Sequence, residues 1–155
     1  MDDAIALYER RVAASPDDVR EHRLLASAYL AARDHQRAAT VIEAALELAP
    51  DDRALLEARG ETRAAAGDVE GALADWRRAL DPGGHNIGGA YMSAFLLERE
   101  GRLEEAIDAW AYVLEYNETR GYALQAEWPR RELERLRTEL GSDDARPTRD
   151  PGHRH

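Results

Sequence analysis

Small side chains return at a fixed interval of 34 residues along this chain. The residues in this register are Ala4, Ala38, Ala72 and Ala106. A bulky side chain follows each of them four positions later, at Tyr8, Ile42, Trp76 and Trp110. A period of this length, kept over several copies, is typical of folds in which one supersecondary unit stacks on the next. The interval therefore predicts a repeat fold, in which each unit buries its apolar face against its neighbour.

Each period contains a second small residue, twelve positions before the first small residue of the next copy. These residues are Ala26, Gly60 and Ala94. Between copies, Pro16 and Pro50 are each followed by two aspartates, which end one helix and offer oxygen acceptors to the first amides of the next. The composition is rich in Ala, Leu, Glu and Arg, which are strong helix formers. The chain is therefore predicted to be all-α, with one helical hairpin per period.

The residues at these positions resemble the tetratricopeptide repeat family, whose pattern is W-x2-L-G-x2-Y, then A-x3-F, then P. The first full unit reads His22-x2-Leu25-Ala26-x2-Tyr29, then Ala38-x3-Ile42, then Pro50. The resemblance covers residues 3 to about 118 and implies an α-solenoid of antiparallel hairpins. It implies about three full repeats, an N-terminal half repeat and a C-terminal capping helix. We expect this repeat domain to span 1–140 and a disordered tail to follow at 141–155.

Three segments depart from the repeat pattern. Arg59 and Arg63 stand where large apolar residues are expected, so their charged ends either pair with nearby carboxylates or serve partner binding. Trp128 replaces the small residue of the register, and Pro129 is expected to start a second helical segment of the cap. The glycine-rich link 83–89 is interpreted as a hinge, with Asn86 as a possible N-cap; a ligand loop is the alternative.

The sequence lacks signatures of several other function classes. It has no cysteine, no histidine spacing typical of a metal site and no catalytic motif, so we expect neither enzyme activity nor a cofactor or metal. The net charge of -10 disfavours nucleic acid and anionic membranes as partners. The chain has no apolar stretch of the roughly 20 residues needed to span a membrane, so we expect a cytoplasmic protein. An enzyme that acts through Arg59, Arg63 and His85 is the hypothesis with the least support.

The family resemblance implies that the first helices of successive repeats line a concave groove. When Ala94 is taken to face its hairpin partner, an advance of about 100° per residue selects the side chains that point into this groove. The predicted partner-binding residues are Arg20, Arg23, Ser27, Leu30, Glu57, Glu61, Tyr91, Phe95, Glu98 and Tyr122. We expect Tyr91 and Phe95 to anchor a partner, because docked aromatic side chains dominate interface energies. The alternative is that these two pack against the capping helix.

Two functions follow from this repeat organisation. The first is a protein-interaction adaptor that holds a protein or peptide segment of a partner in the concave groove. The second is a self-associating structural or chaperone-like protein, in which the unpaired first helix, Ala4 to Ala14, pairs with that of a second copy to give a homodimer.

Overall fold

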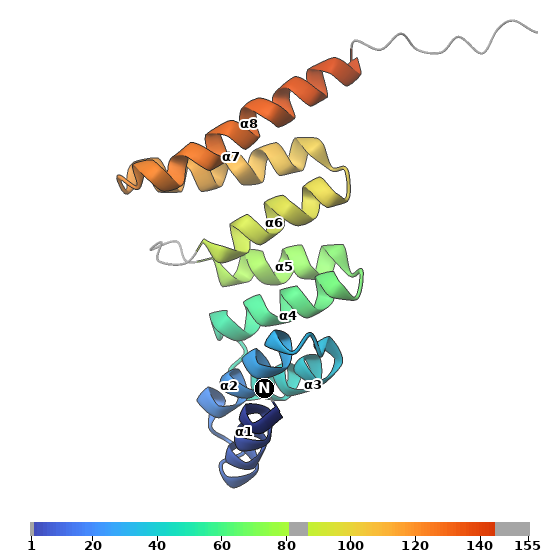
Figure 1. Ribbon diagram of the computed structural model, residues 1–155, viewed down its shortest axis with the longest axis vertical. Coiled ribbons are helices and arrows are strands. Elements are labelled where there is room, and N and C mark those ends of the chain that lie inside the picture. The colour runs from blue at the N-terminus through green and yellow to red at the C-terminus, as the bar shows by residue number, and fades with distance from the viewer. Residues whose placement is uncertain (1, 81–86, 145–155) are drawn as a thin grey trace, which may run out of the picture. The chain divides into compact units, whose positions relative to one another are not determined.

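The computed structural model describes residues 2–80 and 87–144, which form eight α helices and no strand. The helices are α1 (Asp2–Ala14), α2 (Val19–Ala31), α3 (His35–Leu48), α4 (Arg53–Ala65), α5 (Val69–Ala79), α6 (Gly88–Arg99), α7 (Leu103–Thr119) and α8 (Ala123–Asp144) (Figure 1). The predicted fold class, an all-α repeat of helical hairpins, is confirmed. The chain divides into two compact units, Met1–Leu96 and Leu97–His155.

Aspartate side chains cap helices α2 to α5. Asp18, Asp34, Asp52 and Asp68 each accept a hydrogen bond from a backbone amide two or three residues further on. Each cap satisfies one of the amides that the first turn of a helix leaves without a partner. Asp18 and Asp52 are the second aspartates of the two Pro-Asp-Asp joints, so the predicted punctuation is confirmed. Between α4 and α5 the chain turns through Gly67, whose φ of 84° favours glycine.

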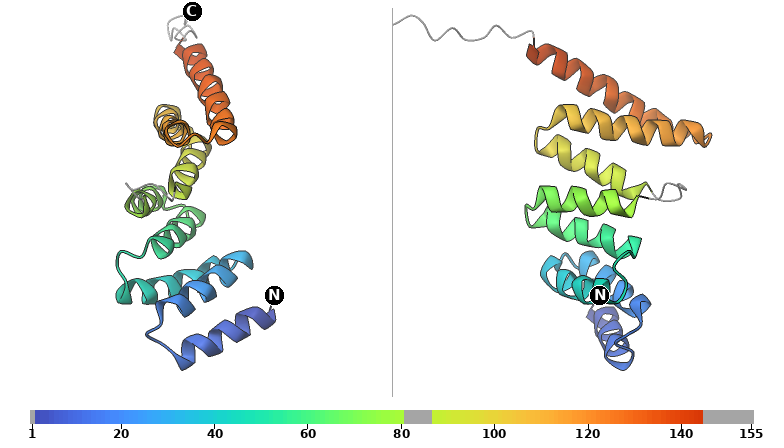
Figure 2. Two further views of the ribbon diagram at one scale, coloured as in Figure 1. Left: turned by 90° about the vertical axis from the view of Figure 1, so that its left-hand side faces the viewer. Right: turned by 180° about the vertical axis from the view of Figure 1, so that it is seen from behind.

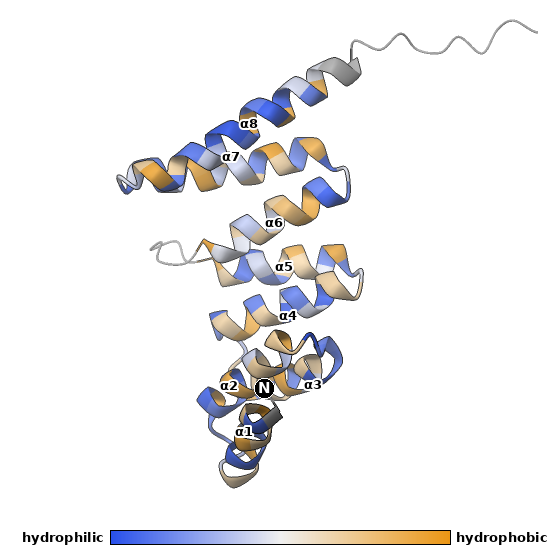
Figure 3. Cartoon of the chain, viewed as in Figure 1, coloured by the Kyte–Doolittle hydropathy of each residue, from blue (hydrophilic) through white to orange (hydrophobic). Residues whose placement is uncertain are grey.

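The first unit is built from successive antiparallel hairpins. Helices α2 and α3 form one hairpin and α4 and α5 the next, with α1 packed on α2 (Figure 2). Both hydrophobic and hydrophilic residues are visible on the helices of the first unit (Figure 3). The small residues Ala26, Ala38 and Ala72 are buried, as is Ile42. These repeating small residues therefore lie at helix contacts, as their spacing predicts, whereas Ala4 on α1 is exposed.

Gly60 allows α4 and α5 to approach closely. A Cβ atom on Gly60 would lie 2.3 Å from Nε1 of Trp76, well inside contact distance. The indole of Trp76 is 2% exposed, and its Nε1 donates a hydrogen bond of 3.1 Å to the carbonyl oxygen of Glu57. The equivalent positions of the preceding hairpin hold Ala26 and Ile42. A smaller residue on α4 thus accompanies a larger one on α5.

We expect Gly60→Ala to destabilise the protein by about 1–2 kcal/mol, because the clash with Trp76 exceeds the gain in helix propensity of about 1 kcal/mol. In a Trp76→Ile background the same change should be neutral or stabilising, since the pair then matches Ala26 and Ile42. Urea denaturation of the four proteins in this double-mutant cycle measures the coupling. An equal cost of Gly60→Ala in both backgrounds would contradict the explanation.

In the second unit, α7 and α8 form a hairpin around a core centred on Trp110. Its other buried residues are Ala106, Val113, Asn117, Ala126, Pro129, Leu133 and Leu136. Trp128, at the register position of the small residues, is 39% exposed, and its ring lies edge-on against that of Trp110 with centroids 5.2 Å apart. The buried face of α8 passes instead through Ala126 and Pro129. Position 128 therefore lies at the edge of the buried face of α8, whereas the small residues of the register lie within the buried face of their helices.

The expectation that Pro129 starts a separate helical segment is wrong, because α8 continues through it. A proline inside a helix leaves the carbonyl oxygen four residues earlier, here that of Gln125, without its amide donor. Nδ2 of the buried Asn117 on α7 donates to this oxygen at 3.1 Å. A side chain from the neighbouring helix thus replaces the lost backbone hydrogen bond.

Some sequence expectations fall outside the described residues. These include Asn86, His85 and most of the glycine-rich link; α6 begins at Gly88. Of the expected tail, 141–155, helix α8 includes the residues as far as Asp144, and the rest is outside the described part. No helix in the described part of the chain is both long enough and apolar enough to cross a membrane.

Candidate functional site

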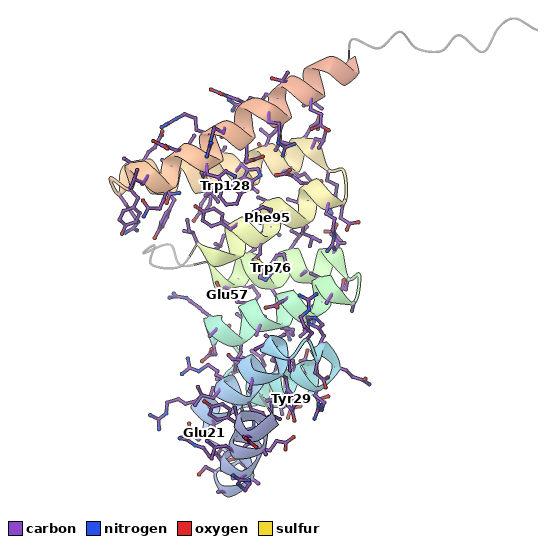
Figure 4. All side chains as sticks on the ribbon, viewed as in Figure 1. Glu21, Tyr29, Glu57, Trp76, Phe95 and Trp128 are labelled. Carbon is purple, nitrogen blue, oxygen red and sulfur yellow. The ribbon has the colours of Figure 1, made fainter. Side chains whose placement is uncertain are left out.

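A hollow of ≈ 340 Å³ opens in the first unit over α2, α4 and the start of α6, the first helices of their repeats. Its lining residues are Ser27, Leu30, Ala54, Glu57, Ala58, Glu61, Trp76, Gly88, Gly89 and Met92. Figure 4 shows Glu57 on α4 and Trp76 on α5 close to one another at this place. Trp76, which is almost completely buried, contributes at the base of the hollow. The first helices of three repeats thus share one concave surface.

Small residues create this hollow. Ala54 and Ala58 occupy one face of α4, and two glycines begin α6. At Gly89 a Cβ atom would lie 2.9 Å from the carbonyl oxygen of Trp76, so only glycine lets α6 approach α5 this closely. The floor is mainly apolar because Leu30 and the 41% exposed Met92 complete it. An apolar depression bordered by a few polar groups is the usual form of a binding site.

Four of the predicted partner-binding residues meet in this hollow: Ser27, Leu30, Glu57 and Glu61. Ser27 is exposed, whereas the other three side chains are partly buried. Glu57 and Glu61 lie one turn apart on α4, so both carboxylates border the same depression. The helical-wheel argument therefore selected adjacent side chains on α2 and α4.

The predicted residues Arg20 and Arg23 are engaged elsewhere. Arg20 pairs with the N-cap Asp18 at 3.2 Å, and Arg23 pairs with the N-cap Asp52 at 3.6 Å. The hydrogen bonds with Arg20 lower the pKa of Asp18 below its usual range, with smaller contributions from charge attraction. Neither arginine is among the lining residues of the hollow. Both arginines therefore pair with the N-cap aspartates that precede α2 and α4.

The two predicted aromatic anchors do not line the hollow. Tyr91 is partly buried and Phe95 is exposed on α6, but Met92 and the two glycines at the start of α6 border the depression. Of the positions on α6 that the helical-wheel argument places on the groove side, Gly88 lines the hollow and position 91 does not. The sequence signal that could have located the hollow is the set of small residues at 54, 58, 88 and 89, which occupy or adjoin the positions predicted to face the groove. Whether Tyr91 and Phe95 bind a partner stays a prediction.

The remaining predicted residues, Glu98 and Tyr122, belong to the second unit. Glu98 accepts a hydrogen bond of 2.6 Å from Nε1 of Trp110 and pairs with Arg135. Hydrogen bonds with Glu132 and with Glu98 raise the pKa of Arg135 above its usual range. Tyr122 is exposed just before α8 begins. Glu98 thus holds α8 and the indole of α7 in place, a structural contact that its spacing did not reveal.

Arg59 and Arg63 form a buried ionic cluster with Asp75. Arg59 donates to both carboxylate oxygens of Asp75, at 2.8 and 2.7 Å, and Arg63 donates to Oδ2 at 2.7 Å. Asp75 is 2% exposed, and Arg59 also reaches Glu43 on α3 at 3.3 Å. The hydrogen bonds with Asp75 raise the pKa of Arg59 above its usual range. The carboxylate-pairing interpretation is therefore confirmed, and the cluster joins α3, α4 and α5.

A second depression of ≈ 460 Å³ lies beside this cluster and is lined by both arginines and by His35, Glu43, Thr62 and Asp68, among others. The hypothesis of an enzyme acting through Arg59, Arg63 and His85 has no further support here, because His85 lies outside the described residues and both guanidinium groups are engaged in ion pairs. Within 2–80 and 87–144, no group of three or more histidine, aspartate or glutamate side chains is arranged to hold a metal ion.

Comparison with known proteins finds the same repeat. A family model described as tetratricopeptide repeat matches residues 1–53 and 23–87. A crystal structure of MamA has a TM-score of 0.65 at 16% identity, covering 97% of this chain and 88% of that one. A further MamA crystal structure gives 0.63 at 15% identity, with 89% of each chain covered. A MamA RS-1 double mutant gives 0.63 at 16% identity, covering 94% and 88%. No curated protein matches the sequence significantly.

Proposed function

Because this chain belongs to the tetratricopeptide repeat family, we propose that it is an adaptor that binds a segment of a partner protein in the hollow over α2, α4 and α6. The family's fold is a scaffold for protein interaction, since stacked hairpins present extended concave surfaces. The proposal assigns that role to one place in this chain.

The main support is that side chains from three successive first helices open into one depression. Leu30, Met92 and the alanines of α4 offer apolar surface that a partner side chain can cover. Glu57, Glu61 and Ser27 offer polar groups at the edge, which orient a bound segment. A depression that combines both kinds of contact suits a peptide, whose backbone and side chains need both.

Filling the hollow tests this function. Ala54 is exposed on the first turn of α4, so Ala54→Trp should occupy the hollow without disturbing the core. We expect proteins that the wild-type chain captures from a cell lysate, identified by mass spectrometry, to be lost with this variant. Ala44→Trp, at an exposed position on α3 outside the hollow, is the matched control and should capture them normally. Equal capture by both variants, with unchanged thermal unfolding, would reject the hollow as the binding site.

Self-association is a second candidate function, supported by exposed leucines at the N-terminal end. Leu7 on α1 is 44% exposed and Leu24 on α2 is 40% exposed. In a homodimer these side chains would be covered by a second copy through a self-complementary contact. Sedimentation of the wild type and of Leu7→Lys distinguishes the two functions, because a dimer would dissociate in the variant. A monomer at high concentration would dismiss this candidate.

A further inference from the structure

We infer that the depression beside the ionic cluster of Arg59, Arg63 and Asp75 is a second binding site, which takes an aromatic side chain of a partner protein. This depression has a volume of ≈ 460 Å³ and lies between α3 and the C-terminal half of α4. It borders a different side of α4 from the hollow of the proposed function, and no described residue lines both. The two sites can therefore be tested separately.

The internal repeat indicates why this depression is open. Ala39 on α3 forms part of its wall. The same repeat position holds Ile5 one period earlier and Leu73 one period later, and these branched side chains are only 8% and 7% exposed. The neighbouring copies of the repeat therefore bury a large aliphatic side chain at this position, whereas Ala39 leaves the space to another molecule.

A second difference between the repeats concerns an aromatic ring. Arg63 occupies the position that Tyr29 holds one period earlier. The ring of Tyr29 is buried in the same cluster as Ile5, and the guanidinium group of Arg37 lies over it, 4.7 Å from the ring centroid. Arg37 makes this contact while its Nε pairs with Asp34, so an ion pair and a ring contact are compatible on one arginine. The second hairpin instead carries an arginine at the position of the ring itself.

The hydrogen-bond partners of Arg63 hold its guanidinium group by the edge. Nη1 donates to Oδ2 of Asp75 at 2.7 Å and to the carbonyl oxygen of Gly71 at 3.4 Å, and Nε lies 3.8 Å from the carboxylate of Asp68. The N–H bonds lie in the guanidinium plane, so partners of this kind leave the flat face for other contacts. The side chain is 33% exposed and borders the depression. A guanidinium plane held in this way is a surface on which an aromatic ring stacks.

The other lining residues favour a neutral ring over a charged ligand. Ala65 and Ala66 add apolar surface. The carboxylates of Glu43, Asp68 and Asp75 all pair with the two arginines of the cluster. A charged ligand would have to compete with these ion pairs, and removing one partner of a buried pair is costly. An aromatic side chain contacts the guanidinium face through its π electrons and displaces no partner.

Subtractive phage display tests this inference on the full chain. A library of random dodecapeptides is first depleted on immobilised Ala39→Leu, in which the repeat position carries the same residue as Leu73, and is then selected on the wild type. We expect the enriched peptides to share a Trp, Tyr or Phe residue. The affinity of synthetic copies, measured by fluorescence anisotropy, should fall by about tenfold for Ala39→Leu. Ala44→Leu, at an exposed position of α3 outside the depression, is the matched control and should stay within about twofold of the wild type.

Two further measurements separate the ring from its apolar volume and the fold from the site. Replacing the aromatic residue of a peptide by cyclohexylalanine keeps the volume and removes the π face, so the affinity for the wild type should fall by about threefold. Ala39→Leu should raise the midpoint of thermal unfolding by about 2 °C, because the added side chain is buried as its equivalents are. Ala54→Trp, which fills only the hollow, should bind the enriched peptides as the wild type does.

Several results would overturn the inference. Enriched peptides without a shared aromatic residue, or no enriched peptide, would show that the depression does not select a ring. Unchanged affinity with cyclohexylalanine would show that the guanidinium face contributes nothing. A lower midpoint of thermal unfolding for Ala39→Leu would show that the repeat does not explain the open space. Loss of the peptides from Ala54→Trp would assign them to the hollow, in which case the proposed function would stand without this second site.

Discussion

Asp75→Val is expected to destabilise the protein by about 3 kcal/mol, because it leaves two partly buried guanidinium groups without their carboxylate. Removing one partner of a buried ion pair typically costs about 3–5 kcal/mol. The lower end applies here, since Arg63 is a third exposed and water can partly solvate it. Urea denaturation followed by circular dichroism measures the change. A loss below about 1 kcal/mol would contradict a stabilising role for this cluster.

The preceding hairpin supplies the matched control. The positions of Arg59, Arg63 and Asp75 correspond, one period of 34 earlier, to Leu25, Tyr29 and Val41. The triple variant Arg59→Leu/Arg63→Tyr/Asp75→Val should be at least as stable as the wild type, because apolar residues of similar size replace buried charges without loss. The hydroxyl of Tyr29 donates a hydrogen bond to the carboxylate of Glu9. Glu43 lies 34 residues after Glu9 and could accept the same hydrogen bond in the Arg63→Tyr variant. A triple variant as unstable as Asp75→Val would refute this equivalence.

Trp76→Ala is expected to cost about 3–5 kcal/mol, the usual range for a buried aromatic side chain. The change leaves a cavity beside Gly60 and removes the hydrogen bond to the carbonyl oxygen of Glu57. It should also abolish binding in the hollow, whose base Trp76 forms. Trp128→Ala is the comparison. The indole of Trp128 is partly exposed, so its removal should lower the stability by only about 1 kcal/mol, through the loss of its contact with Trp110. Equal costs for the two tryptophans would contradict the burial argument, and thermal denaturation measures both.

Local features of the chain predicted most of the hairpins. The Pro-Asp-Asp joints place the caps of α2 and α4, because a capping aspartate acts only on amides two or three residues away. The small residues Ala26 and Gly60 predict where helices meet, because only small side chains allow backbones to approach closely. Such signals need no knowledge of distant residues. They recur at the period of 34, and this regular spacing distinguishes them from the many other alanines of the chain.

Features that depend on a second helix were harder to predict. Pro129 indicated a break in α8, yet Asn117 on α7 supplies the missing hydrogen bond and the helix continues. The arginines of α4 suggested two interpretations, and only the position of Asp75 on α5 decides between them. The hollow is bordered by Met92 and not by Tyr91, and the close approach of Gly89 on α6 to Trp76 on α5 is a contact between two helices that local sequence signals do not reveal.

The fold class, the length of the repeat and most of the places where helices begin and touch can be predicted from the order of the amino acids alone. These properties follow from helix propensity, capping and side-chain size, which act within a few residues or repeat at a constant spacing. Three further properties became visible in the folded chain: which charges are buried together, how each helix is rotated about its axis and where small residues leave a hollow. These properties depend on packing between residues from different helices. Such residues are far apart along the chain, so signals that act within a few residues do not reveal which of them pack together.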